Sequence, residues 1–172
     1  MGILPMLPNE RRVARRMRPR RSGPVRCAVL AAATLLALAG LKRLGLADRA
    51  TSLLDPADFV PAVGQGAIAI TTRAGEADVA ALLAPILDAG TGLALRCERA
   101  LLRVLDGSCR TPIGGFAQVE GGAIALHAII LLPDGSQFFE TKLRGATNEA
   151  ESLGESAART LLAQAPVGFF AA

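Results

Sequence analysis

The chain has 172 residues, of which 51% are hydrophobic and 20% are charged, so the composition supports a globular core and excludes wholesale disorder. It has no Trp, no Tyr and only six Phe, which argues against a base-stacking surface for nucleic acids. The three cysteines and one histidine have no zinc-ligand spacing, so we expect no metal, and so few cysteines favour a reducing, cytoplasmic location.

Positive charge is concentrated in a leader, residues 1–32, which holds eight arginines and one glutamate. The rest of the chain is weakly acidic, so the basic character belongs to the leader alone. The apolar stretch from Cys27 to Gly40 is shorter than the roughly 20 residues that span a membrane. Three interpretations stay open: a secretory or anchoring segment, an arginine-rich arm for nucleic acid, and an unstructured extension, which we favour.

Short elements follow the leader. The pattern predicts a buried strand over 32–38, a helical turn over 41–46 and a second strand over 67–72. Between them, Gly64 and Gly66 permit backbone conformations that other residues resist, which favours a tight crossing or a hinge.

Two helices are predicted next. Apolar residues recur at helical spacing from Val79 to Leu87, although Pro85 predicts a kink or a break there. Thr91 is a suitable N-cap for a second helix that ends near Leu105.

The second helix has two different faces. Its predicted core face, on which Cys97 is a small packing residue, holds Cys97, Ala100, Leu101, Val104 and Leu105. A row of arginines (Arg96, Arg99 and Arg103) occupies another face, which is either solvated or the border of an anionic cleft.

The remaining sequence predicts an antiparallel meander followed by a helix. Strands are expected near 113–120, 123–132 and 137–143, with Gly-rich turns between them. On the middle strand, Ile124, Leu126, Ala128 and Ile130 share one face, and His127 packs on the other as a structural imidazole. Asn148 and Glu151 are read as a capping box for a last helix that carries Leu153, Ala157 and Leu161 inward.

Together these elements predict an α+β fold: a three-stranded antiparallel sheet with helices on one face, preceded by a remnant of an α/β domain. We divide the chain into the leader (1–32), the remnant with its crossover (33–75) and a C-terminal domain (76–172). A remnant without its usual neighbours is expected to expose Leu35, Leu36, Ile68 and Ile70.

Three stretches in order resemble hydroxymethylbilane synthase, also called porphobilinogen deaminase. They read Leu38-Ala-Gly-Leu-Lys-Arg-Leu-Gly-Leu46, then Pro61-Ala-Val-Gly-Gln-Gly-Ala67, and then Glu98-Arg-Ala followed by Leu105-Asp-Gly-Ser-Cys-Arg-Thr-Pro-Ile-Gly-Gly115. The resemblance covers roughly residues 33–168. It implies a transferase of tetrapyrrole and heme biosynthesis, which joins four porphobilinogen units with release of ammonia.

The resemblance also implies a cofactor and site residues. The family builds its product on a dipyrromethane held by a thioether, and the motif places that thioether at Cys109. A thiolate in a Gly-Ser-Cys loop is a suitable soft nucleophile for this bond, and Arg110 would favour its ionisation. Arg43 matches a family arginine that binds the carboxylates of the pyrrole chain, and Gly64, Gln65 and Gly66 match the hinge between domains.

Part of the family pattern has no counterpart in this sequence. The family aspartate that stabilises charge during condensation has no counterpart, so no catalytic residue is assigned. The arginine-rich second domain of the family has no counterpart either. We therefore expect a truncated or frame-disrupted form, inactive alone, with a leader unrelated to the family.

The expected partners follow from the same resemblance. They are porphobilinogen or the pyrrole chain, with no nucleic acid and no membrane, and the family is monomeric although this fragment is expected to aggregate. The alternative is a non-catalytic α+β binding module with a basic, apolar leader that associates with membranes.

Overall fold

A computed structural model describes residues 2–4, 12–14, 34–106, 111–167 and 169 of the chain. These residues fall into two compact units. The first contains residues 1–6 and 60–172, and the second contains residues 7–59. Each unit is described by itself.

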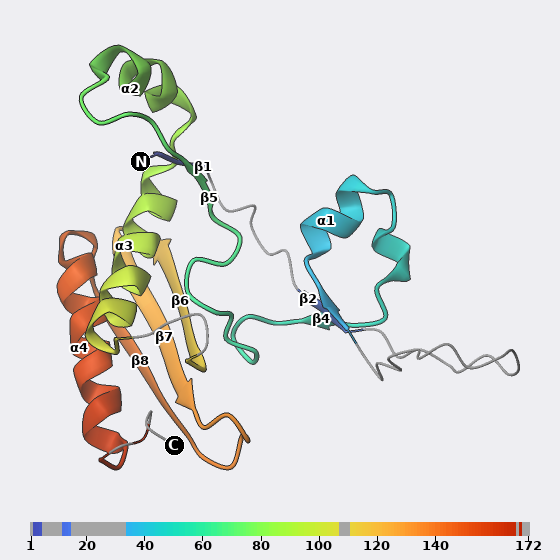
Figure 1. The fold of residues 1–172 in the computed structure, drawn as a ribbon, viewed down its shortest axis with the longest axis vertical. Helices are drawn as coiled ribbons and strands as arrows, with labels where there is room; N and C mark the ends of the chain where they lie inside the picture. Colours follow the sequence, from blue (N-terminus) through green and yellow to red (C-terminus); the bar gives the residue numbers. More distant parts are fainter. Residues whose placement is uncertain (1, 5–11, 15–33, 107–110, 168, 170–172) are drawn as a thin grey trace, which may run out of the picture. The chain divides into compact units, whose positions relative to one another are not determined.

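A three-stranded antiparallel sheet forms the centre of the first unit (Figure 1). Its strands are β6 (Ile113–Glu120), β7 (Ala123–Leu131) and β8 (Phe138–Ala146), in the order of the chain. Gly121 and Gly122 both have positive φ, the conformation that a two-residue hairpin turn requires. The predicted meander is therefore confirmed.

Two helices, α3 (Ala89–Val104) and α4 (Ala150–Gln164), lie side by side against one face of this sheet (Figure 1). The side chains buried between the helices and the sheet include Cys97, Leu101, Leu105, Ile124, Leu126, Ala128, Ile130, Ala157 and Leu161. The strand face and the inward helix faces predicted from periodicity are thus confirmed, as is the α+β fold class.

The helix starts differ from the sequence prediction. The N-cap of α3 is Asp88, whose side chain accepts a hydrogen bond from the backbone N–H of Thr91 at 2.6 Å, so the prediction of Thr91 as N-cap was wrong. Asn148 and Glu151 form no capping box either, because a 3-10 turn, Thr147–Glu149, precedes α4. There the Glu149 carboxylate accepts from the N–H of Ala146 at 3.4 Å. In both cases a carboxylate three residues away satisfies a backbone N–H at the start of the helix: in α3 the N-cap side chain accepts, and at the 3-10 turn the N-cap N–H donates.

The segment before α3 leaves apolar side chains in solvent. Helix α2 (Ala77–Leu83) ends at a 3-10 turn, Ala84–Ile86, so the predicted break at Pro85 is confirmed. No residue of α2 is buried, and Leu82 is 79% exposed. Within the described residues no single helix is long and apolar enough to cross a membrane. Only the bent pair Ala77–Ile86 and Ala89–Val104 has the length and composition for one.

Each unit also contains a small sheet of short strands. Strand β5 (Ile68–Ile70) pairs with β1 (Gly2–Leu4) in the first unit. In the second unit, β2 (Arg12–Ala14) lies between β3 (Leu35–Leu36) and β4 (Leu53–Leu54).

Helix α1 (Leu38–Arg43) and a 3-10 turn, Ala47–Arg49, lie between β3 and β4 in the chain. Leu38 and Leu41 are the buried pair of this unit, and Ala50 packs against them. A strand was predicted over 32–38, and β3 is a strand within that range, but Leu35 and Leu36 are exposed, so the predicted burial was wrong.

The exposure expected of the remnant is confirmed for Leu35, Leu36 and Ile68. Ile70 is half-buried, so its predicted exposure was wrong; it pairs with Gly2 across the β1–β5 ladder.

Candidate functional site

The crossover, residues 61–66, runs antiparallel to the beginning of β6. The N–H of Gly115 donates to the carbonyl of Pro61 at 2.9 Å, and Ala62 forms a β-bridge with Gly114. The chain then turns back, because Gly64 and Gly66 have φ values of +74° and +87°. Those positive values explain why glycines are needed at both positions.

Two glycines of β6 allow the crossover to come this close. A Cβ at Gly114 would lie 2.7 Å from Cγ2 of Ile129 and 3.1 Å from Cγ1 of Val60. A Cβ at Gly115 would lie 2.9 Å from Cδ2 of Leu101 and 3.0 Å from Cγ2 of Val63. Any larger residue would therefore push the crossover away from the sheet.

Glu98 of α3 joins the crossover to the sheet. Its side chain is 4% exposed, and its two oxygens accept from the backbone N–H groups of Gly64 and Ala117, each at 2.8 Å. Burial raises the pKa of this carboxyl to about 7, although both hydrogen bonds act in the opposite direction. The carboxylate thus holds three segments together at one point.

Glu98 is part of the third sequence motif, but no role was predicted for it, although its position in the helix gives a signal. Glu98 lies four residues after Ala94 and three before Leu101, so it shares their inward-facing stripe. A charged residue within such a stripe needs hydrogen-bonding partners, and that need identifies it as a residue with a specific role.

Cys109 lies outside the described residues, in the segment 107–110 between α3 and β6. On the α3 side, Asp106 has a φ of +50°, an uncommon conformation that aspartate tolerates better than most residues. On the β6 side, the N–H of Leu131 donates to the carbonyl of Pro112 at 3.0 Å. On the β6 side this hydrogen bond ties the end of the connection to β7.

Cys97 is a core residue, whereas cofactor attachment is predicted for Cys109. It is fully buried in the core, as predicted, and burial raises the pKa of its thiol to about 12. Such a thiol is not ionised near neutral pH, so Cys97 is a packing residue and no nucleophile.

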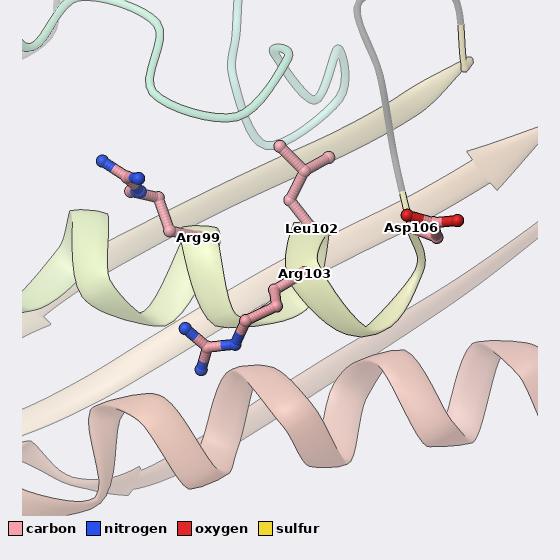
Figure 2. A pocket seen from close by; sticks show the side chains of 4 residues that line it. All are labelled: Arg99, Leu102, Arg103 and Asp106. Carbon is pink, nitrogen blue, oxygen red and sulfur yellow. The ribbon is translucent and has the colours of Figure 1, made fainter.

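An open depression of about 350 Å³ lies at the C-terminal end of α3 and is lined by Arg99, Leu102, Arg103 and Asp106 (Figure 2). Arg103 extends towards α4, where its guanidinium lies 3.5 Å from Glu155, whereas Arg99 extends away from α4. The predicted exposed arginine face is confirmed. An exposed guanidinium suits a ligand that carries carboxylates, so Arg99 is chemically suited to bind such a group.

The other predicted site residue, Arg43, is the last residue of α1 and is exposed. It belongs to the second unit, whereas Gly64, Gln65 and Gly66 belong to the first. The structure therefore places Gly64 in contact with Glu98, whereas Arg43 belongs to the other unit.

His127 lies on the sheet face opposite the helices, as predicted. Its Nε2 is 3.0 Å from Oε2 of Glu140, and this hydrogen bond lowers the pKa of the glutamate. Across the described part of the chain, no group of three or more His, Cys, Asp or Glu side chains is placed to hold a metal ion.

A small α+β fold entered by a crossover with two glycines of positive φ defines the structural class, and comparison with known proteins gives the family. Residues 93–163 match the family model for the porphobilinogen deaminase C-terminal domain. Residues 12–81 match the model for the porphobilinogen deaminase dipyromethane cofactor binding domain. The chain belongs to the porphobilinogen deaminase family, a family of transferases in porphyrin biosynthesis whose cofactor is dipyrromethane.

Individual relatives agree with this assignment. The chain is 52% identical over 138 residues to the porphobilinogen deaminase of Nitrobacter hamburgensis. This aligned region is 80% of the chain and 44% of the relative. It is 49% identical over 132 residues to the porphobilinogen deaminase of Bordetella parapertussis. This aligned region is 77% of the chain and 42% of the relative. The chain thus spans less than half the length of the curated relatives it matches.

The matched ranges bear on the predicted residues. Arg43 and the crossover lie within the cofactor-binding match, and Cys109 lies within the C-terminal match. The first match begins at residue 12, inside the leader, and the division of the chain at residue 32 stays a prediction.

Proposed function

We propose that this chain is the cofactor-anchoring part of a hydroxymethylbilane synthase, and that Cys109 holds dipyrromethane through a thioether. The observation that carries the proposal is the ordered match to both family models, with Cys109 in the connection between α3 and β6. Bound there, the cofactor supplies the end of the pyrrole chain to which porphobilinogen units are joined.

The chemistry of the bond suits a cysteine in this connection. The sulfur forms a bond to the methylene carbon of an aminomethylpyrrole, the carbon–nitrogen bond breaks, and ammonia leaves with the thiol proton. A thioether then resists hydrolysis better than an ester or a thioester would. Arg110, beside the sulfur in the sequence, favours the thiolate, and Arg99 in the neighbouring depression offers a cation to the carboxylates of the group.

Arg43 and the crossover have proposed roles in the same function. Arg43 is exposed at the end of α1, where its guanidinium is available for bidentate contact with an acetate or propionate group. Gly64, Gln65 and Gly66 form the hinge through which the C-terminal domain is connected to the preceding part of the chain. A monomer that acts in the cytoplasm on porphobilinogen or the pyrrole chain completes the proposal.

We further propose that the chain alone does not condense porphobilinogen. No aspartate was identified in it to stabilise the positive charge that develops on the pyrrole nitrogens, and such stabilisation is commonly a large part of catalysis. We expect no complementation of a synthase-deficient strain by this chain alone. Growth of the complemented strain would contradict this part of the proposal and leave the anchoring role intact.

Intact-mass measurement tests the anchoring role. The full chain, purified from a host that makes porphobilinogen, is expected to carry the mass of a dipyrromethane, and the variant Cys109→Ser is expected to carry none. Cys27→Ser is the matched control, because it removes a cysteine of the leader and is expected to retain the adduct. A bare polypeptide mass for the unaltered chain would overturn the proposal and leave the membrane-associated binding module as the alternative.

A further inference from the structure

Glu98 is the only buried charged side chain among the residues that the structure describes. Burying a carboxyl group is unfavourable unless its oxygens are hydrogen-bonded, so its surroundings show what stabilises it. Both partners are backbone N–H groups, one on the crossover and one on β6.

We propose that Glu98 is a positioning residue whose carboxyl group holds the crossover against α3 and β6. The frame so fixed is the one from which the connection carrying Cys109 extends. The link to Cys109 rests on the proposed function, whereas the positioning of the crossover does not.

The geometry shows one carboxyl group that forms hydrogen bonds to two segments at the same time. Oε1 accepts from Ala117, in the middle of β6, which ties the helix before segment 107–110 to the strand after it. Oε2 accepts from Gly64, at the turn of the crossover. A side chain with one acceptor oxygen satisfies only one of these N–H groups, and a shorter acid does not reach both segments.

The crossover also covers Glu98. Gly64, Gln65 and Ala67 of the crossover region and Thr91, Ala94, Leu95 and Glu98 of α3 surround one small gap. A Cβ at Gly64 would lie 3.4 Å from Cδ1 of Leu95, so the backbone lies directly on the helix. Lifting the crossover would therefore return the carboxyl group to water.

Because lifting the crossover exposes Glu98 to water, the equilibrium between the closed and the lifted crossover depends on pH. The direction of this dependence follows from the environment of Glu98 in the closed state. Burial raises the pKa to about 7, above the ordinary 4.5, so the closed crossover binds a proton that the lifted one releases. Closure is fully favoured below about pH 4.5, and the advantage is lost as the pH rises through about 7.

Few other groups contribute to this pH dependence. Residues 60–66 contain no titratable side chain, and β6 contains only Glu120, at its far end. On α3 the interacting neighbour is Cys97, whose thiol stays protonated in this range, and Arg99 is exposed.

Hydrogen exchange at the Gly64 amide in the full 172-residue chain tests the proposal. After correction for the intrinsic exchange rate, the opening equilibrium at Gly64 is expected to rise about 30-fold between pH 5 and pH 7 and to level off above. In Glu98→Gln the opening is expected to be independent of pH. It should also be about fivefold to tenfold greater than at pH 5 in the unaltered chain, because the amide group satisfies one N–H and opposes the other. Glu120→Gln is the matched control and is expected to keep the unaltered profile.

Each outcome decides the matter. A pH-independent opening in the unaltered chain, or full protection of Gly64 in Glu98→Gln, would overturn the proposal. If Glu98→Gln does not fold, which exchange of the β7 and β8 amides would reveal, the pH profile of the unaltered chain decides alone. A missing cofactor adduct with the expected exchange profile refutes the proposed function only, and an adduct with a flat profile refutes the positioning role only.

Discussion

The helices and sheet at the C-terminal end and the short elements of residues 34–59 differ in how much apolar surface they bury among themselves. In the former, Leu101, Ile124, Leu126, Ile130 and Leu161 have almost no exposure. In the latter, Leu38 and Leu41 form the whole buried cluster, and the exposed leucines are Leu35, Leu36, Leu44, Leu46 and Leu53. Elements of similar apolar content thus differ in burial because only long ones present a continuous face to one another.

The contrast suggests where a single change affects stability. In the C-terminal part, side chains fill the space between two helices and a sheet, so both removal and addition of volume are unfavourable. In residues 34–59, a side chain such as Leu44, which is 71% exposed, has no cavity to leave behind. The predictions below use matched substitutions in the two settings.

The closest approach of α3 and α4 gives the largest expected effect. A Cβ at Gly154 would overlap the backbone carbonyl of Cys97 and lie 3.0 Å from Cβ of Ala100. Gly154→Val is therefore expected to lower the free energy of unfolding by at least about 4 kcal/mol, because one helix must move as a whole. Urea denaturation followed by circular dichroism measures this loss.

Gly92→Ala is the matched control for Gly154→Val. Gly92 lies in the same helix pair, and its added Cβ would come no closer than 3.9 Å to a guanidinium nitrogen of Arg96. We expect a gain of about 0.5–1 kcal/mol from helix propensity. Equal effects of the two substitutions would show that α3 and α4 do not pack at Gly154 as described.

A core truncation gives the next largest effect and tests the comparison of the two regions directly. Leu101 is fully buried, so Leu101→Ala is expected to cost about 3 kcal/mol. Leu44→Ala makes the same chemical change at an exposed position and is expected to stay within about 0.5 kcal/mol of the unaltered chain. A comparable loss for Leu44→Ala would mean that the second unit buries more surface than its described residues indicate.

The C-terminal fold was largely predictable because local patterns and tertiary packing agree there. The alternation in β7, the Gly121–Gly122 pair and the Pro133-Asp-Gly135 turn predict the same sheet that the structure shows. In residues 34–59 they do not agree: the apolar run over 32–38 has the composition of a buried strand, yet burial depends on partners that periodicity does not reveal.

The candidate site was predictable in part. The motifs identified the family and the crossover glycines, but spacing alone did not show that Glu98 holds the crossover, because its partners are backbone groups 34 and 19 residues away. Which residue caps a helix is equally hard to predict from sequence, since Asp88 and Thr91 both have suitable side chains near the start of α3.

The cap of α3 gives the smallest effect and resolves this last ambiguity. Asp88→Ala removes the acceptor for the N–H of Thr91 and is expected to cost about 1 kcal/mol near neutral pH. That hydrogen bond lowers the pKa of Asp88 below its ordinary 3.8. The contribution is therefore present above about pH 4 and is lost as the pH falls through the lowered pKa.

Asp88→Asn separates the cap from the charge. Asparagine accepts the same hydrogen bond without titrating, so this variant is expected to match the unaltered chain near pH 7 and to lose less stability in acid. Thermal unfolding of the three proteins between pH 3 and pH 7 measures the difference. If Asp88→Ala were as stable as the unaltered chain at every pH, the helix would not begin at Asp88. The contact at Thr91 would then contribute nothing to holding the start of α3, from which the position of Glu98 two turns later is set.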